Sequence, residues 1–207
     1  MRRAATTMLV ALTVLLPARA MSGVAIEGLY GIVRPPEADF RAAVAGAAAD
    51  DDFSENSLQI AGGTLLLNFG AFEIGAIVDA TFGDGFTQTA IGGLAGFRIG
   101  DRLRLDLLGE VGGHRFGNLA DDPSVVTSSS SDEWLLYVGL RPGLAYRFEL
   151  GAPGGAGFLL GIWGFARWDV TDKTVPVTVG VADDTEPGNL ELGGTSIGAA
   201  IRAGFEL

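Results

Sequence analysis

The chain has 207 residues, enough for one domain, and it contains no cysteine, so no disulfide contributes to its stability. Its formal net charge of −11 argues against a nucleic-acid partner, because binding to phosphates requires a basic surface. Its mean hydropathy of +0.34 is high for a soluble protein, and the 32 glycines, scattered rather than spaced every third residue, exclude collagen and argue against helices.

The first twenty residues have the features of a secretory signal peptide. Arg2 and Arg3 form a positive start, residues 4–16 are apolar, and Ala18-Arg19-Ala20 is a cleavage site. We predict cleavage after Ala20, which leaves residues 21–207 as one domain. No later stretch reaches the ~18 consecutive apolar residues that a transmembrane helix needs.

Eight segments of the remaining chain favour β-strands, because apolar and polar residues alternate with a period of two. In 103–110, for example, Leu103, Leu105 and Leu107 alternate with Arg104 and Asp106. The predicted strands are 24–33, 58–69, 72–81, 89–99, 103–110, 134–148, 158–169 and 195–207.

The pattern is irregular at three places. In 58–69 the apolar positions change from even numbers (Leu58, Ile60) to odd ones (Leu65), so we predict a bulge at Gly62-Gly63 that resets the register. Gly112-Gly113 could act in the same way. Pro142 removes a hydrogen-bond donor from its strand, which suggests a local bulge with Gly143.

Alternate connections, 34–57, 83–88, 117–133 and 170–194, are assigned to the long side, and all of them except 83–88 are much longer than 70–71, 100–102 and 151–157. Long external loops and short periplasmic turns are typical of outer-membrane barrels. Aromatic residues gather near both ends of the strands, as membrane interfaces favour. The sequence therefore predicts an all-β fold, an eight-stranded antiparallel transmembrane β-barrel with four long outward loops and short periplasmic turns.

Charged residues of the predicted strands fall on the face that the alternation assigns to the lumen. They are Glu27, Glu73, Asp79, Arg98, Arg104, Asp106, Glu110, Arg141, Arg147, Arg167, Arg202 and Glu206, with Asp169 near a strand end. Charges enclosed in so narrow a barrel must pair. Two interpretations stay open, a lumen plugged by salt bridges and a narrow polar conduit.

Negative charge is concentrated in the outward connections. Segments 34–57, 83–88, 117–133 and 170–192 carry net charges of −4, −1, −4 and −4. Oxygen-rich loops suit divalent cations, so we predict weak binding of Ca²⁺ or Mg²⁺ at two acidic runs. These are Asp50, Asp51 and Asp52 in the first loop, and Asp183 and Asp184 in the fourth.

The closing segment 197–207, with Phe205 two residues before the terminal Leu207, is similar to the signal that outer-membrane proteins present to the barrel-assembly machinery. An aromatic last residue is usual there, and Leu207 departs from it. With the leader and the loop pattern, the chain resembles the small eight-stranded barrels of the OmpA/OmpX type over nearly all of 21–207. The resemblance implies the outer membrane of a Gram-negative bacterium, with membrane lipid, lipopolysaccharide and the assembly machinery as partners.

No catalytic motif accompanies this pattern. The chain has a single histidine, His114, and no recognisable nucleophile or zinc motif, so no cofactor and no enzymatic activity are predicted. We therefore expect a non-enzymatic barrel with an envelope-structural or surface-interaction role through its acidic loops. Alternatives are a narrow channel for small solutes or apolar molecules, a lipid-modifying enzyme using His114, and a periplasmic lipocalin-like barrel.

Overall fold

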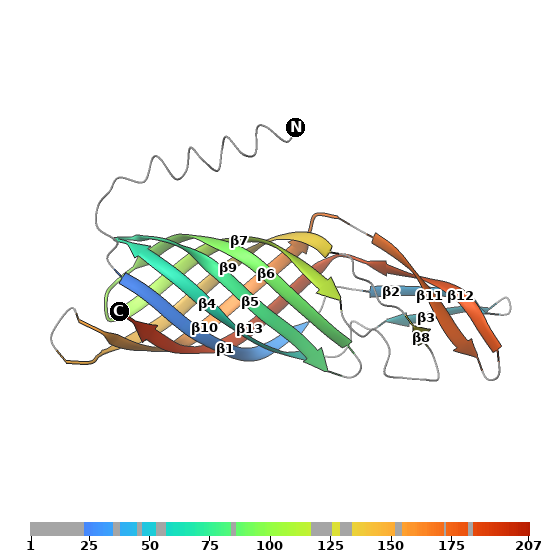
Figure 1. Cartoon of the computed structure of the whole chain (residues 1–207), viewed down its shortest axis with the longest axis horizontal. Coiled ribbons are helices and arrows are strands. Elements are labelled where there is room, and N and C mark those ends of the chain that lie inside the picture. Colours follow the sequence, from blue (N-terminus) through green and yellow to red (C-terminus); the bar gives the residue numbers. More distant parts are fainter. Residues whose placement is uncertain are drawn as a thin grey trace, which may run out of the picture.

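The computed structural model describes residues 23–34, 38–44, 47–52, 57–83, 86–116, 126–128, 134–151, 155–171, 173–181 and 184–207. The predicted leader, residues 1–20, lies outside these ranges. Within them, eight strands form a closed barrel and five form a separate sheet beyond one end of it (Figure 1). The same residues contain no helix that is long and apolar enough to span a bilayer.

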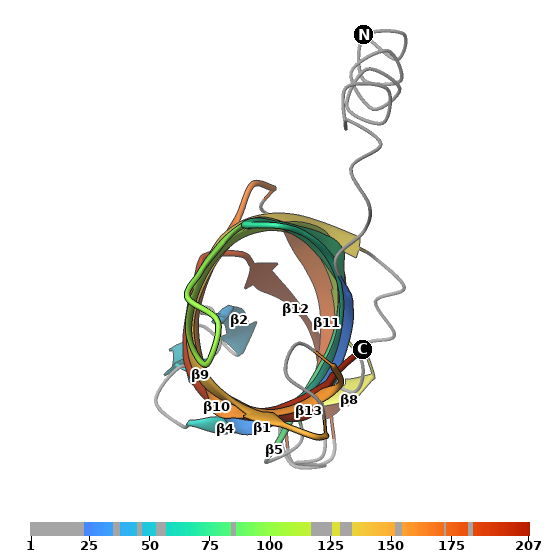
Figure 2. The same ribbon diagram turned by 90° about the vertical axis from the view of Figure 1, so that its left-hand side faces the viewer.

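The barrel follows the predicted strands closely. Its strands are β1 (Gly23–Arg34), β4 (Leu58–Phe69), β5 (Phe72–Gly83), β6 (Phe86–Ile99), β7 (Leu103–Phe116), β9 (Trp134–Glu149), β10 (Gly157–Asp169) and β13 (Thr195–Glu206). Each pairs antiparallel with its neighbour in this order, and β1 closes the ring on β13, with Leu29 opposite Arg202. Figure 2 shows the closed ring end-on. The predicted fold class is confirmed.

Short turns mark one end of the barrel, here called the turn end. It carries the connections 70–71 and 100–102 and the C-terminal Leu207. Gly70 and Gly100 adopt φ values of 69° and 87°, a left-handed conformation that glycine reaches without steric cost. The opposite end, here called the sheet end, carries the five-stranded sheet.

This sheet is built from connections that the sequence analysis treated as loops. Its strands are β2 (Ala38–Val44), β3 (Ala47–Asp52), β8 (Val126–Ser128), β11 (Lys173–Val181) and β12 (Asp184–Leu192). Their order is β3-β2-β12-β11-β8, so three separate outward connections contribute to one sheet. Loop length and composition gave no indication of these pairings.

The predicted bulge at Gly62-Gly63 is wrong. β4 keeps one register against both β1 and β5 along its whole length. Leu58 and Ile60 face the lumen and are buried, like Thr64 and Leu66 farther along the strand. The apolar positions seemed to change from even to odd numbers because the lumen also accepts apolar side chains. Hydrophobicity alone does not distinguish an apolar position in the lumen from one that faces lipid.

The other two suggested bulges are wrong as well. The register around Gly112 and Gly113 is constant against β6 and β9. Pro142 lies opposite Leu107 of β7, and towards β10 the pairing skips Arg141 and Pro142 without a shift. Proline has no backbone N–H to donate, and this short interruption of the hydrogen-bond ladder is sufficient to accommodate it.

The outside of the barrel is apolar. Leu105 and Leu107 are 51% and 56% exposed, whereas Asp106 and Leu108 between and beside them are fully buried. At the turn end the rings of Tyr146, Phe148, Phe158 and Phe205 form a chain of contacts across β9, β10 and β13. Trp134 and Trp168 are exposed near the sheet end. Such a surface belongs in lipid, with aromatic residues at its two interfaces.

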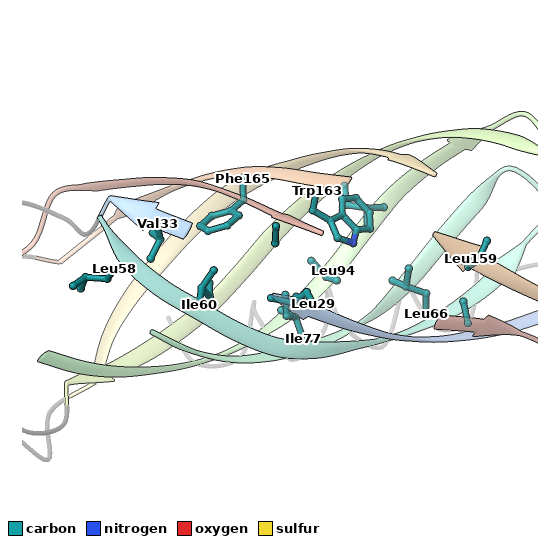
Figure 3. Packing of buried hydrophobic residues seen from close by; sticks show 13 residues of the cluster. Leu29, Val33, Leu58, Ile60, Leu66, Ile77, Leu94, Leu159, Trp163 and Phe165 are labelled. Carbon is teal, nitrogen blue, oxygen red and sulfur yellow. The ribbon is translucent and has the colours of Figure 1, made fainter. Parts of the chain in front are cut away.

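The lumen is filled by pairing large side chains with glycines. Side chains of the apolar cluster extend along it, from Leu66 and Leu159 to Val33 and Leu58 (Figure 3). A Cβ on Gly143 would lie 2.4 Å from the ring of Trp163. Cβ atoms on Gly92 and Gly112 would each lie 2.7 Å from the hydroxyl of Tyr137. Inward glycines therefore provide the space that the aromatic residues occupy.

If the outer face of β13 lies in lipid, the loss of stability on introducing a charge there should depend on depth in the bilayer. Ile201, in the middle of β13, and Ile197, near its sheet end, are 61% and 60% exposed. Ile201→Arg should lower the free energy of unfolding by about 2–4 kcal/mol and Ile197→Arg by about 0–1 kcal/mol. Urea unfolding in lipid vesicles, followed by tryptophan fluorescence, measures both; equal losses would contradict the lipid-facing assignment.

Lumen packing predicts that substitution by alanine affects stability very differently at Gly143 and at Gly93. Gly143→Ala forces a methyl group into the ring of Trp163 and should cost about 1–3 kcal/mol, as overpacking does. At Gly93 a Cβ would meet nothing closer than 3.9 Å, so Gly93→Ala should be neutral or slightly stabilising. The same unfolding measurement applies, and a harmless Gly143→Ala would refute the tight packing of Trp163.

Candidate functional site

All twelve charged residues predicted for the inner face project into the lumen. Ten of these residues are less than a tenth exposed. The side chains of the other two, Arg98 and Arg147, lie near the turn end and are 15% and 13% exposed. Six are arginines and six are carboxylates. Their contacts form three groups along the barrel axis.

The first group surrounds Glu206 at the turn end. Its carboxylate accepts hydrogen bonds from Arg98 at 2.7 Å, Arg104 at 3.0 Å and Arg147 at 2.9 Å. The side-chain amide of Asn68 donates a fourth bond at 2.9 Å. One carboxylate therefore joins β4, β6, β7 and β9 to β13.

Arg104 connects this group to the next. Besides Glu206, its guanidinium donates to Glu73 of β5 at 2.9 Å and lies 3.8 Å from Asp106. Asp106 forms an ion pair with Arg202 of β13. A planar guanidinium with five donors can serve several carboxylates at once, which a lysine ammonium does less well.

The middle group centres on Arg202 and Trp163. Arg202 lies 3.5 Å from Glu27 of β1, and its guanidinium stacks 4.0 Å above the ring of Trp163. The indole Nε1 of Trp163 donates to Glu27 at 3.2 Å. The face of the Trp163 ring therefore stabilises the Arg202 cation, and its N–H donates to the carboxylate that lies beside that cation.

The third group lies towards the sheet end, around Glu110. Glu110 accepts from the hydroxyl of Tyr137 at 2.7 Å, from Arg141 at 2.9 Å and from Arg167 at 2.7 Å. Arg167 also pairs with Asp79 of β5, with one bond of 3.0 Å. Its guanidinium lies 4.9 Å from the ring of Tyr137.

His114 lies next to this group and has an acidic partner that the sequence did not reveal. Its Nε2 is 3.2 Å from a carboxylate oxygen of Asp169, and its ring stacks on Tyr137 at 5.6 Å. Asp169 is 55 positions away on β10, and the two side chains meet because β7 and β10 both pair with β9, which lies between them. Both side chains are buried in the lumen rather than exposed to lipid.

Side chains from every barrel strand take part in these contacts, and β4 contributes Asn68. Apart from the contact between Arg104 and Asp106 within β7, these interactions join different strands, so the network links the strands to one another across the lumen. Chemically it is a buried, nearly balanced arrangement of paired charges.

The predicted cation ligands lie in the five-stranded sheet. Asp50, Asp51 and Asp52 end β3, and Asp184 begins β12, whereas Asp183 lies outside the described residues. Where side chains are described, no group of three or more histidine or acidic residues is arranged to hold a metal. Cation binding by the loops stays a prediction.

Comparison with known proteins gives matches at the level of structure. No protein-family model matches the chain, and no curated protein matches its sequence. The outer membrane protein OprG from Pseudomonas aeruginosa superimposes with a TM-score of 0.62 and 14% identity, over 93% of this chain and 98% of that one. Neisserial surface protein A (NspA) gives 0.50 and 10%, over 87% and 96%. The outer membrane protease OmpT from Escherichia coli gives only 0.34, which supports no inference.

At these identities the likeness concerns the fold and not the activity. The chain has the fold of the small outer-membrane barrels, as the sequence predicted. The apolar outer surface gives an independent physical reason for the same assignment, because a closed barrel is the β-structure that can cross a bilayer. The two observations together support the predicted location in the outer membrane.

The charged lumen predicts that replacing two arginines of one hairpin, Arg104 and Arg102, lowers stability by very different amounts. Arg104 is buried between Glu206 and Glu73, whereas Arg102 is 68% exposed and pairs with Glu149 at 3.2 Å. Arg104→Gln should lower the free energy of unfolding by about 3–5 kcal/mol, because it leaves buried carboxylates unpaired. Arg102→Gln should cost about 0–1 kcal/mol, as for exposed pairs. Similar losses for both variants in vesicle unfolding would mean that water reaches the lumen freely.

Proposed function

We propose that the chain is a closed, non-enzymatic outer-membrane barrel that displays an acidic, folded sheet at the cell surface. Its role would be to support the envelope or to make surface contacts through that sheet. The observation that carries the proposal is the network of buried ion pairs that crosses the lumen at three levels.

The network favours a barrel that does not conduct. The interior of an eight-stranded barrel is narrow enough for its own side chains to fill. An ion crossing this one would have to separate Glu206 from three arginines, then Arg202 from Asp106, then Glu110 from Arg141 and Arg167. Each separation leaves a charge unpaired in a poorly solvated space, which is costly.

The sheet end favours a surface role. Three of the four outward connections contribute strands to the five-stranded sheet, and each of these connections carries a net charge of −4 in the sequence. Concentrated charge of one sign creates a potential that selects partners and ions of the opposite sign. Because strands from the three connections pair in one sheet, the charge that these connections carry is gathered at the sheet end.

The environment of His114 argues against lipid modification. A lipid substrate would approach from the bilayer, yet His114 is 1% exposed and packs between Tyr137 and Asp169 inside the barrel. A general base also needs access to the group from which it takes a proton. His114 is better explained as part of the lumen packing.

A narrow channel for small apolar solutes is the second candidate function. It is favoured by the row of apolar side chains that extends along the lumen beside the charges (Figure 3). A solute following Leu66, Leu29 and Ile60 would displace packed side chains without separating ion pairs. Trp163 and Phe165, which also belong to this cluster, would have to move.

Recording in planar bilayers tests the proposal. The refolded protein should show no steady ohmic conductance under conditions in which a porin control conducts. Steady conductance would overturn the closed barrel. Electrical silence together with protein-dependent flux of a small apolar solute into liposomes would instead favour the second candidate.

A further inference from the structure

Seven polar atoms in the middle of the lumen form no hydrogen bond with any group that the structure describes. They belong to six side chains of residues that are each at most 4% exposed. The atoms are Glu27 Oε1, Thr64 Oγ1, Glu73 Oε2, Asp106 Oδ1, Arg104 Nε, and Nε and Nη1 of Arg202. Buried polar groups are nearly always hydrogen-bonded, because an unmatched donor or acceptor is costly away from water. The seven atoms therefore point to a further binding partner.

The six side chains form one continuous group. Thr64 of β4 lies directly opposite Glu27 of β1, and Glu27 lies 3.5 Å from Arg202 of β13. From Arg202, ion pairs continue in turn to Asp106, Arg104 and Glu73. The unmatched atoms are therefore gathered in one part of the lumen and are not scattered along it.

Glycines on the neighbouring strands explain why two of the carboxylates keep an unmatched oxygen. Glu27 lies opposite Gly204 of β13, and Glu73 lies opposite Gly96 of β6. A glycine adds no side chain to the lumen, so neither position offers a hydroxyl or an amide to the carboxylate across from it. The missing partner is therefore not supplied by the facing position of either strand.

The mixture of donors and acceptors indicates which ligand fits. The carboxylates only accept hydrogen bonds while they are ionised, and the Nε–H groups of Arg104 and Arg202 only donate. A cation would match the oxygens and be repelled by the guanidiniums, and no acidic group among the described side chains is arranged to hold a metal. An anion would be repelled by the carboxylates. A water molecule both donates and accepts, so it matches both kinds of atom.

We propose that these six side chains bind a small cluster of water molecules in the middle of the lumen. A buried water commonly makes about three hydrogen bonds to groups that are otherwise unmatched, so the unmatched atoms correspond to about two or three waters. The waters join carboxylates to guanidiniums that do not bond them directly. Bound solvent is then a structural component of the plug.

Protein groups separate this site from both mouths of the barrel. Towards the turn end, Glu206 is held by three arginines. Towards the sheet end, Glu110 is held by two arginines and a tyrosine, and apolar side chains such as Leu29 and Ile60 lie in the lumen on that side (Figure 3). The inference rests on the closed barrel of the proposed function, because a lumen open at both ends would hold bulk water at every level.

Nuclear magnetic resonance of the refolded protein in nanodiscs, with isotope-labelled arginine, tests the proposal. A bound water transfers magnetisation to nearby N–H protons, and in a rotating-frame spectrum the sign of this transfer is opposite to that of proton exchange. The Nε–H protons of Arg104 and Arg202 should show such cross-peaks with water. Arg167 is a control that is also buried, and its Nε–H, which donates to Glu110 at 3.1 Å, should show none.

Two variants of similar shape locate the water. Thr64→Val removes the hydroxyl and nearly keeps the shape of the side chain, so it should weaken the water cross-peak of Arg202, because the water loses one of its about three bonds. Thr81→Val changes a threonine that is also buried, on β5 nearer the sheet end, and should leave that cross-peak unchanged. Heat-modifiable gel mobility reports that both variants fold.

Different results would overturn the site and the closed barrel. No water cross-peak at Arg104 and Arg202, in a barrel that does not conduct, would overturn the water site and leave the proposed function standing. Equal cross-peaks at Arg167 would show that water fills the lumen generally and would overturn the local site; steady conductance in planar bilayers would then overturn the proposed function as well.

Two further results would count against the water cluster. An Arg202 cross-peak that Thr64→Val and Thr81→Val affect alike would show that the water does not reach Thr64, and the shared site would be wrong. Shifts of the Arg104 and Arg202 signals that saturate on titration with sodium, calcium or phosphate ions would show that an ion occupies the site in place of water.

Discussion

Charged side chains enclosed where bulk water does not reach must find partners of opposite charge, and this constraint governs the interior of the barrel. Glu206, Arg202 and Glu110 each satisfy it by reaching across the lumen to other strands rather than along their own. Pairing of this kind works only if the cylinder closes in one register, since a shift of one residue would turn every charge towards lipid. The electrostatics of the lumen therefore favour the observed strand register.

The same constraint separates what the sequence could predict from what it could not. Alternation located all eight barrel strands, because lipid and lumen impose opposite requirements on neighbouring positions. It failed at Leu58 and Ile60, where lumen and lipid both accept an apolar side chain and parity carries no information. The partners of the charges were also out of reach: Asn68 and Glu206 are 138 positions apart, and only closure of the barrel brings them together.

The outward connections illustrate a second limit. Their acidity was evident from composition, and composition suggested solvated loops. The alternation of valines in β11 was nevertheless present in the sequence, and it carries meaning only when β11 is placed opposite β12, and β12 opposite β2. Pairing between connections more than 100 positions apart cannot be deduced from a local pattern.

The fitting of aromatic rings onto inward glycines has a consequence for how this protein can change over time. A side chain cannot grow at Gly143 unless Trp163 shrinks, nor at Gly198 unless Phe165 gives way, since the added atom would lie 2.4 Å and 2.2 Å from those rings. Single substitutions in the lumen are therefore mostly penalised, and accepted ones must come as complementary pairs on adjoining strands. The outer wall, where one apolar residue replaces another at little cost, is free to diverge. Two such barrels could lose nearly all sequence identity and keep the same cross-section.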